Sequence, residues 1–102
     1  MLAPQSRLTV RMKFMGDLTT IIGQRNLELE MPAESTVRDL FASLSKTYGE
    51  AFTARVFSNP TKLHHYILIF IDGESIKGQG ALDAKLGKGE VDVVMLPMFG
   101  GG

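Results

Sequence analysis

Two stretches near the start of the chain alternate between apolar and polar residues. Residues 8–14 place Leu, Val, Met and Phe at every second position, and residues 27–31 do the same with Leu, Leu and Met. A period of two is typical of a strand with one face on a core. The pattern predicts two strands, which we expect to pair antiparallel across a loop that contains Gly16 and Gly23.

Residues 37–48 change to a helical period, with apolar side chains three and four positions apart. Thr36 followed by Asp39 resembles an N-terminal capping pair, with Ser35 as the competing cap. Gly49 suits the position just past a helix end. An apolar stripe on such a helix is far more often core than functional site, so we expect it to cover the sheet.

The second half of the chain carries weaker signals. Residues 50–62 show no clear period and predict a long loop, whereas Asp72-Gly73 is a favoured two-residue hairpin turn. The other predicted elements are a strand, a short returning strand, one helical turn and a last strand, at residues 66–71, 74–76, 81–86 and 91–96.

This order of elements predicts the fold class. A long helix after an opening hairpin must pack across one face of the sheet, which makes the chain an α+β domain. The compact solution is the β-grasp arrangement, a mixed four- to five-stranded sheet with the first and last strands parallel at its centre. We expect one domain over residues 1–102, with a flexible N-terminus at 1–6 and a flexible C-terminal tail at 97–102.

Composition and charge exclude several classes of function. The 102 residues carry eleven basic and eleven acidic side chains, so no strong field points to nucleic acid or to an anionic membrane. The start lacks the basic region and apolar stretch of a secretory signal, and the longest apolar run, at 66–71, is too short to span a bilayer. We therefore expect a cytoplasmic protein.

The residue patterns of common enzymes are missing. The chain has no cysteine, no H-E-x-x-H motif and no phosphate-binding loop. His64 and His65 are adjacent on or near a strand, so they would point to opposite faces and could not chelate one metal ion. We expect no catalytic residue, no metal site and no bound cofactor.

The chain instead ends in LPMFGGG. Six residues from Pro97 reach at most about 20 Å, and beyond Phe99 this thread has no side chain that would block a narrow channel. Its terminal carboxylate is ionised at neutral pH and could be presented to a nucleotide inside another protein. A frayed or added end is the alternative, and composition alone does not choose between them.

Strand parity adds a second observation. If the apolar positions of residues 8–14 face the helix, Met15 faces away from it, and the same alternation turns Val94 and Leu96 away. Since the first and last strands should be parallel neighbours, these side chains would form an apolar spot at the foot of the tail. Such patches usually mark partner surfaces, unless a loop covers them or the parity is shifted by one residue.

The ending resembles the P-P-V-[ATS]-G-G terminus of the MoaD/ThiS sulfur carriers, which are ubiquitin-like β-grasp proteins. Pro97 falls on the first proline, Met98 on the second, Phe99 on the valine, Gly100 on the small residue, and Gly101 and Gly102 on the terminal pair. LGKGEVDVV and STVRDLFASL are similar to the family's last turn and strand and to its helix start. KLHHYILIFIDGESI is most similar to the cysteine-forming carriers of the CysO type.

The resemblance implies a reaction cycle. An E1-like adenylyltransferase of the MoeB/ThiF kind would adenylate the Gly102 carboxylate with ATP and Mg²⁺, and sulfur would then replace one oxygen to give a thiocarboxylate. Residues 97–101 would thread into the partner, and a synthase subunit would receive the sulfur. The chain would be a carrier and its partners the catalysts.

The residues leave the pathway open. Molybdopterin synthesis is the leading interpretation, with the large subunit of molybdopterin synthase as acceptor, and CysO-type delivery to a cysteine synthase is a close second. A protein modifier joined to lysines through Gly102, and an interaction module with an inert tail, are the alternatives from other classes.

Overall fold

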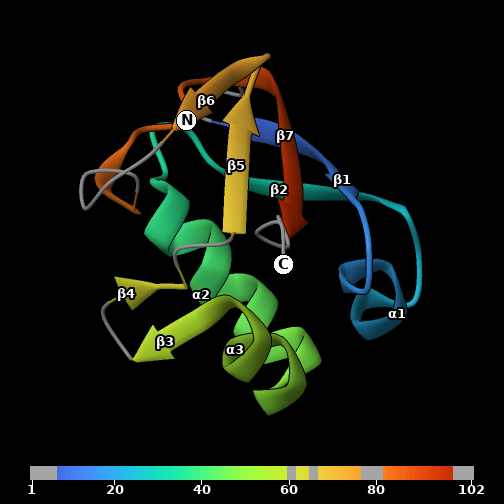
Figure 1. Cartoon of the computed structure of the whole chain (residues 1–102). Helices are drawn as coiled ribbons and strands as arrows, with labels where there is room; N and C mark the ends of the chain where they lie inside the picture. The colour runs from blue at the N-terminus through green and yellow to red at the C-terminus, as the bar shows by residue number, and fades with distance from the viewer. Residues whose placement is uncertain (1–6, 60–61, 65–66, 77–81, 98–102) are drawn as a thin grey trace.

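The computed structural model describes residues 7–59, 62–64, 67–76 and 82–97 of the chain. These residues form a five-stranded mixed sheet in the order β2-β1-β7-β5-β6 (Figure 1). The strands are β1 (Arg7–Phe14), β2 (Asn26–Pro32), β5 (Ile67–Ile71), β6 (Glu74–Ile76) and β7 (Gly89–Pro97). β1 and β7 are parallel and the other pairs antiparallel. The first and last strands therefore lie at the centre, which confirms the predicted β-grasp architecture.

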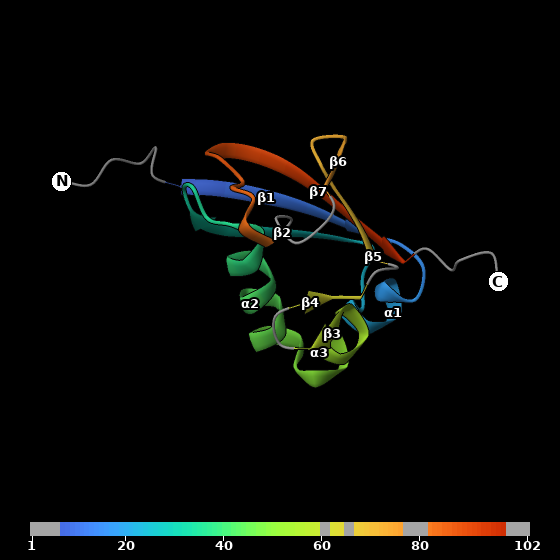
Figure 2. The same cartoon turned by 60° about the vertical axis from the view of Figure 1, so that its left-hand side comes forward.

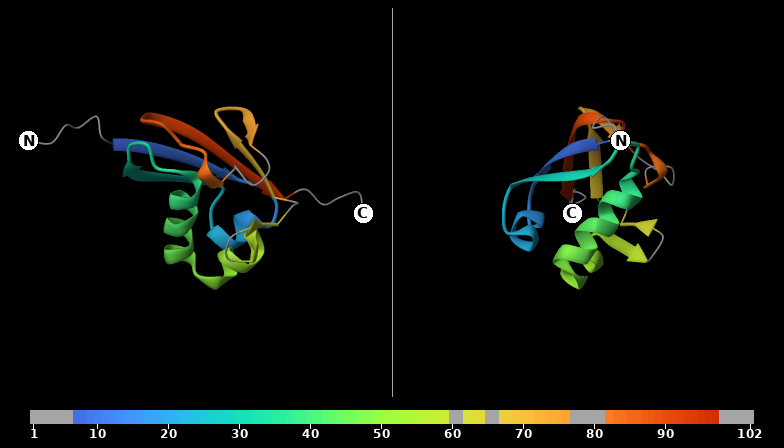
Figure 3. Two further views of the ribbon diagram at one scale, coloured as in Figure 1. Left: turned by 90° about the vertical axis from the view of Figure 1, so that its left-hand side faces the viewer. Right: turned by 180° about the vertical axis from the view of Figure 1, so that it is seen from behind.

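Helix α2 (Val37–Tyr48) packs below one face of this sheet (Figure 3). Its start is the predicted capping pair: the Asp39 N–H donates to Thr36 Oγ1 at 3.2 Å, and the Thr36 N–H donates to Asp39 Oδ2 at 2.9 Å. The N–H groups at a helix start have no partner within the helix, and these two hydrogen bonds supply partners for two of them. The buried positions of α2 are Val37, Leu40, Phe41 and Leu44.

The core lies between α2 and the inward side chains of the strands. The side chains of β1 alternate between the two faces of the sheet, and those that face α2, from Leu8 to Phe14, are at most 2% exposed. The core residues of the three central strands are Leu8, Val10, Met12, Phe14, Ile67, Ile69, Val91, Val93 and Met95. The ring of Phe41 meets those of Phe52 and Phe57 edge-on, which closes the core on the helix side.

The long loop predicted at residues 50–62 was wrong. This segment holds α3 (Glu50–Val56), β3 (Phe57–Asn59) and β4 (Lys62–Leu63), the last two forming a small separate sheet. Phe52 and Val56 are one helical turn apart and fully buried. Two apolar positions are too few to establish a period, and Gly49, which was expected only to end a helix, also begins the next one.

The connection between the first two strands also contains a helix that was not predicted, α1 (Leu18–Ile22). Its two buried residues, Leu18 and Ile22, are again only one turn apart. The hairpin turn between β5 and β6 is confirmed, because Asp72 and Gly73 both have positive φ, 49° and 86°. The expected helical turn at 81–86 is present as a short 3₁₀ turn at Leu82 and Asp83.

Candidate functional site

Strands β1 and β7 bring the two predicted docking segments to one end of the sheet. Phe14 is paired with Met95 in the parallel ladder, and the Met15 N–H donates to the Met95 carbonyl oxygen at 3.1 Å. Met15 and Leu96 are therefore the next residues on adjacent strands. The end of β7 lies close to α1, which begins at Leu18, shortly after Met15 (Figure 2).

The side chains of this end alternate between the two faces as predicted. Phe14, Val93 and Met95 are fully buried against the helices. Met15, by contrast, is 46% exposed, and among the described residues no other large hydrophobic side chain is classed as exposed. Val94 and Leu96 are half-buried, because their faces are turned away from α2 and only neighbouring strands shield them.

Strand β5 adds two residues that the sequence reasoning missed. Leu68 lies opposite Leu96, and Phe70 lies opposite Val94, in the antiparallel ladder of β5 and β7. Directly opposed residues share a face, so these two half-buried side chains also face away from α2. We call the set of Met15, Leu68, Phe70, Val94 and Leu96 the apolar patch. The alternation within YILIFI was the available signal, but it does not reveal which strand lies alongside.

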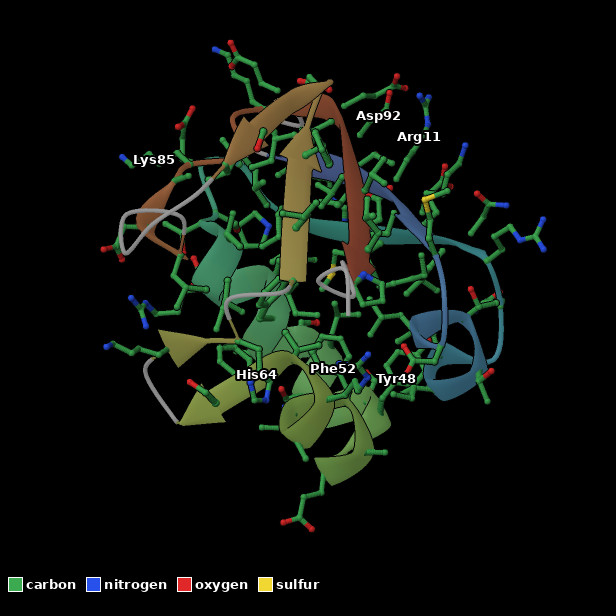
Figure 4. The ribbon with its side chains drawn as sticks, viewed as in Figure 1. Arg11, Tyr48, Phe52, His64, Lys85 and Asp92 are labelled. Atoms are coloured by element: carbon green, nitrogen blue, oxygen red, sulfur yellow. The ribbon has the colours of Figure 1, made fainter. Side chains whose placement is uncertain are left out.

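The other end of the same face is charged. Arg11 reaches three carboxylates, with nitrogen–oxygen distances of 2.7 Å to Glu90, 3.7 Å to Glu28 and 3.8 Å to Asp92. The side chains of Arg11 and Asp92 project together from the upper part of the sheet (Figure 4). We call Arg11, Glu28, Glu90 and Asp92 the charged cluster. It spans β2, β1 and β7, and its single cation faces three carboxylates, so the cluster is acidic overall.

Pro97, the first residue of the predicted tail, is part of the sheet. Pro97 is the last residue of β7, is buried, and pairs with Ile67 of β5, so it belongs to the sheet and not to a tail. A sheet position was not expected because proline usually ends a strand. The residues predicted to thread into a partner or to be modified, Met98, Phe99, Gly100, Gly101 and Gly102, lie outside the described residues.

A groove of about 460 Å³ lies on the helix side of the molecule. It is formed by α2, α3 and β3, with Phe41 and Phe57 on its apolar walls and Arg38 and Glu50 among its lining residues. Because it is on the opposite side of the sheet from the apolar patch, the two surfaces cannot be one site.

Two further properties of the described residues concern metals and membranes. Within these ranges, no three His, Asp or Glu side chains are grouped so that they could hold a metal ion. The longest helix described, α2, has twelve residues, and neither it nor the shorter ones combine the length and apolarity needed to cross a membrane.

Comparison with known proteins places this geometry in a family. The model of the ThiS family matches residues 12–102, which include every residue of the apolar patch and the terminal glycines. The chain belongs to the ThiS family. This is a family of small ubiquitin-like sulfur carriers of the ThiS/MoaD kind. No curated protein sequence matches this chain significantly.

Solved structures share the fold of this ThiS-family chain at low sequence identity. SAMP1, small archaeal modifier protein 1 from Haloferax volcanii, has a TM-score of 0.76 at 22% identity, covering 92% of this chain and 99% of SAMP1. CysO in the BexX/CysO complex of Amycolatopsis orientalis scores 0.70 at 24% identity, with 91% and 99% covered. A Pyrococcus furiosus protein assigned as molybdopterin converting factor, subunit 1, scores 0.70 at 22%, with 90% and 99% covered.

Proposed function

We propose that this ThiS-family chain carries sulfur on its C-terminal glycine. The observation that supports the proposal is the position of the apolar patch, which surrounds the end of β7, five residues before Gly102. Five residues span at most about 17 Å when extended. A partner that docks on the patch would therefore have the terminal carboxylate within reach of its own active site.

The proposed chemistry takes place on the carboxylate of Gly102. One of its oxygens attacks the α-phosphorus of ATP, bound with Mg²⁺ in an E1-like adenylyltransferase, and pyrophosphate leaves. Hydrosulfide then attacks the acyl carbon and AMP leaves, so that a thiocarboxylate remains. This chain supplies the tether and the docking surface, while the partner supplies the nucleotide site and the catalytic groups.

Molybdopterin synthesis is the pathway we propose first, because it is the commonest one for carriers with this C-terminal motif. The large subunit of molybdopterin synthase would then accept the sulfur. CysO-type delivery to a cysteine synthase is the second candidate, favoured by the central segment KLHHYILIFIDGESI. A third possibility within the family, attachment of Gly102 to lysines of other proteins, begins with the same adenylate but ends in an amide.

Mass spectrometry of the intact chain tests the proposal. After incubation with its cognate adenylyltransferase, Mg-ATP and sulfide, the chain should gain the mass of one oxygen-to-sulfur exchange, located at Gly102 by fragmentation. The matched control is the chain without Gly102, which should remain unmodified at an unchanged unfolding temperature. Modification at any other residue, or none with an enzyme proven active on ATP, would contradict the carrier function.

The pathway is tested with the thiocarboxylated product. Loss of the added sulfur to the molybdopterin synthase large subunit, and not to a cysteine synthase, would support the first candidate. The reverse would select the second, and an amide bond to lysine would select the modifier.

A further inference from the structure

The turn that follows β1 lies directly against the last residue of β7. Gly16 has a φ of +63°, in the left-handed region that favours glycine, and its carbonyl oxygen accepts from the Thr19 N–H at 3.2 Å as α1 begins. A Cβ placed on Gly16 would lie 3.0 Å from Cγ and 3.2 Å from Cδ of Pro97. Any side chain at position 16 would therefore press on the ring of Pro97, which would have to move by a few tenths of an ångström.

Pro97 cannot yield in the way that most side chains do. Its ring is closed onto its own backbone nitrogen, so Cδ cannot move far without the main chain, and Cγ can move only by a change of ring pucker. On its other side Pro97 is paired with Ile67 of β5. The backbone at the end of β7 is thus held between β5 and the turn at Gly16.

The turn itself is attached to the body of the domain. Arg55 of α3 donates to both carboxylate oxygens of Asp17, at 2.8 and 3.0 Å, and the Arg55 side chain is only 18% exposed. Thr19 Oγ1 donates to the Phe14 carbonyl oxygen at 3.3 Å. A paired, partly buried guanidinium of this kind gives the turn a defined position relative to the helices.

We propose that Gly16 is a positioning residue for the C-terminal tail. Together with Pro97 it sets the point and the direction in which the chain leaves the sheet towards Gly102. The inference rests on the proposed function, because direction matters only if Gly102 must reach a partner's active site. Met15, the most exposed member of the apolar patch, immediately precedes Gly16 in the chain. One turn would therefore align the docking surface with the tether.

The test compares Gly16→Ala with Gly23→Ala in the full-length protein. Gly23 ends the same helix α1 with a φ of +87°, but nothing lies within 4 Å of a Cβ placed there. Both variants place alanine in the left-handed region, so both should lower the unfolding temperature. Only Gly16→Ala should lower the kcat of adenylation, by about tenfold or more with KM nearly unchanged, because a displaced tether misplaces the reacting carboxylate.

A measurement without the partner separates this inference from the carrier function. Backbone amide resonances of residues 98–102 should shift in Gly16→Ala and remain as in the wild type in Gly23→Ala. If the wild-type chain is not adenylated at all, the carrier function fails, and these resonances alone decide the role of Gly16.

The double variant Gly16→Ala/Pro97→Ala provides the rescue. Removing the ring atoms frees the space for the new Cβ, so kcat should recover to the level of Pro97→Ala alone. The unfolding temperature should stay below that of Pro97→Ala by about the loss seen in Gly23→Ala, because alanine at position 16 is still in the left-handed region. Recovery supports the inference even if Gly16→Ala itself fails to fold. Equal kcat for the Gly16 and Gly23 variants, an effect on KM alone, or no rescue by Pro97→Ala would overturn it.

Discussion

The two faces of the sheet differ in solvent exposure, and the difference is clearest between the neighbouring residues Phe14 and Met15. Phe14 is fully buried under the helices, while Met15, the next residue, is 46% exposed on the opposite side. One face is closed by α2 and α3, and its apolar side chains stabilise the fold. Apolar residues on the other face contribute less to folding, so their presence there needs another reason.

The open face of the sheet, which is the one turned away from α2 and α3, has a charged end and an apolar end. In the charged cluster, Arg11 forms ion pairs with three carboxylates of the same chain. In the apolar patch, side chains from β1, β5 and β7 gather at the end of the sheet from which the chain continues to Gly102. The contrast indicates that a partner would gain more from desolvating the patch than from contacting the cluster.

The largest expected effect separates the covered face from the open one. Phe14→Ala should lower the free energy of unfolding by about 3–5 kcal/mol, because it leaves a cavity in the core. Met15→Ala should change it by less than about 0.5 kcal/mol, since its side chain is already in contact with water. Urea denaturation of both variants measures the difference, and similar losses would mean that the two faces are not distinct.

A smaller effect separates the two ends of the open face. Met15→Lys and Leu96→Lys should each weaken binding to the adenylyltransferase by about 2 kcal/mol or more, because an ammonium group would be desolvated in an apolar contact. Calorimetric titration measures the dissociation constants.

Thr9→Lys is the matched control for these two variants. Thr9 is on the same face but is paired with Glu30 of β2 and Glu90 of β7, so an added cation there has acidic neighbours. Its binding should stay near the wild-type value while all three variants remain folded. Unimpaired binding by both patch variants would place the docking surface elsewhere.

The smallest effect is expected within the charged cluster. Arg11→Gln should lower stability by less than about 1 kcal/mol, because the Arg11 side chain is 50% exposed and its ion pairs are screened by water and salt. Thermal unfolding at low and high salt measures the loss, which should shrink as salt increases. Arg7→Gln, which breaks a single pair with Glu30, should do less still. A loss that is large and independent of salt would show that the cluster holds the sheet together.

Much of this fold follows from the local pattern of the chain. Alternation assigned the inward residues of β1 and β7 and placed Met15, Val94 and Leu96 on the open face, because a strand turns successive side chains to opposite sides. Thr36 and Asp39 marked the start of α2, because their mutual hydrogen bonds depend only on nearby residues. Short helices such as α1 and α3 were not recognisable, because each buries only two residues one turn apart.

Contacts between distant segments could be decided only by the tertiary structure. Leu68 and Phe70 join the apolar patch because β5 lies beside β7 in one particular register, and alternation within a strand contains no information about its neighbour. Pro97 joins the sheet, and its ring meets Gly16, although 81 positions separate the two residues in sequence. Local periodicity determines which way a side chain points, whereas its partners depend on how the whole chain closes its core.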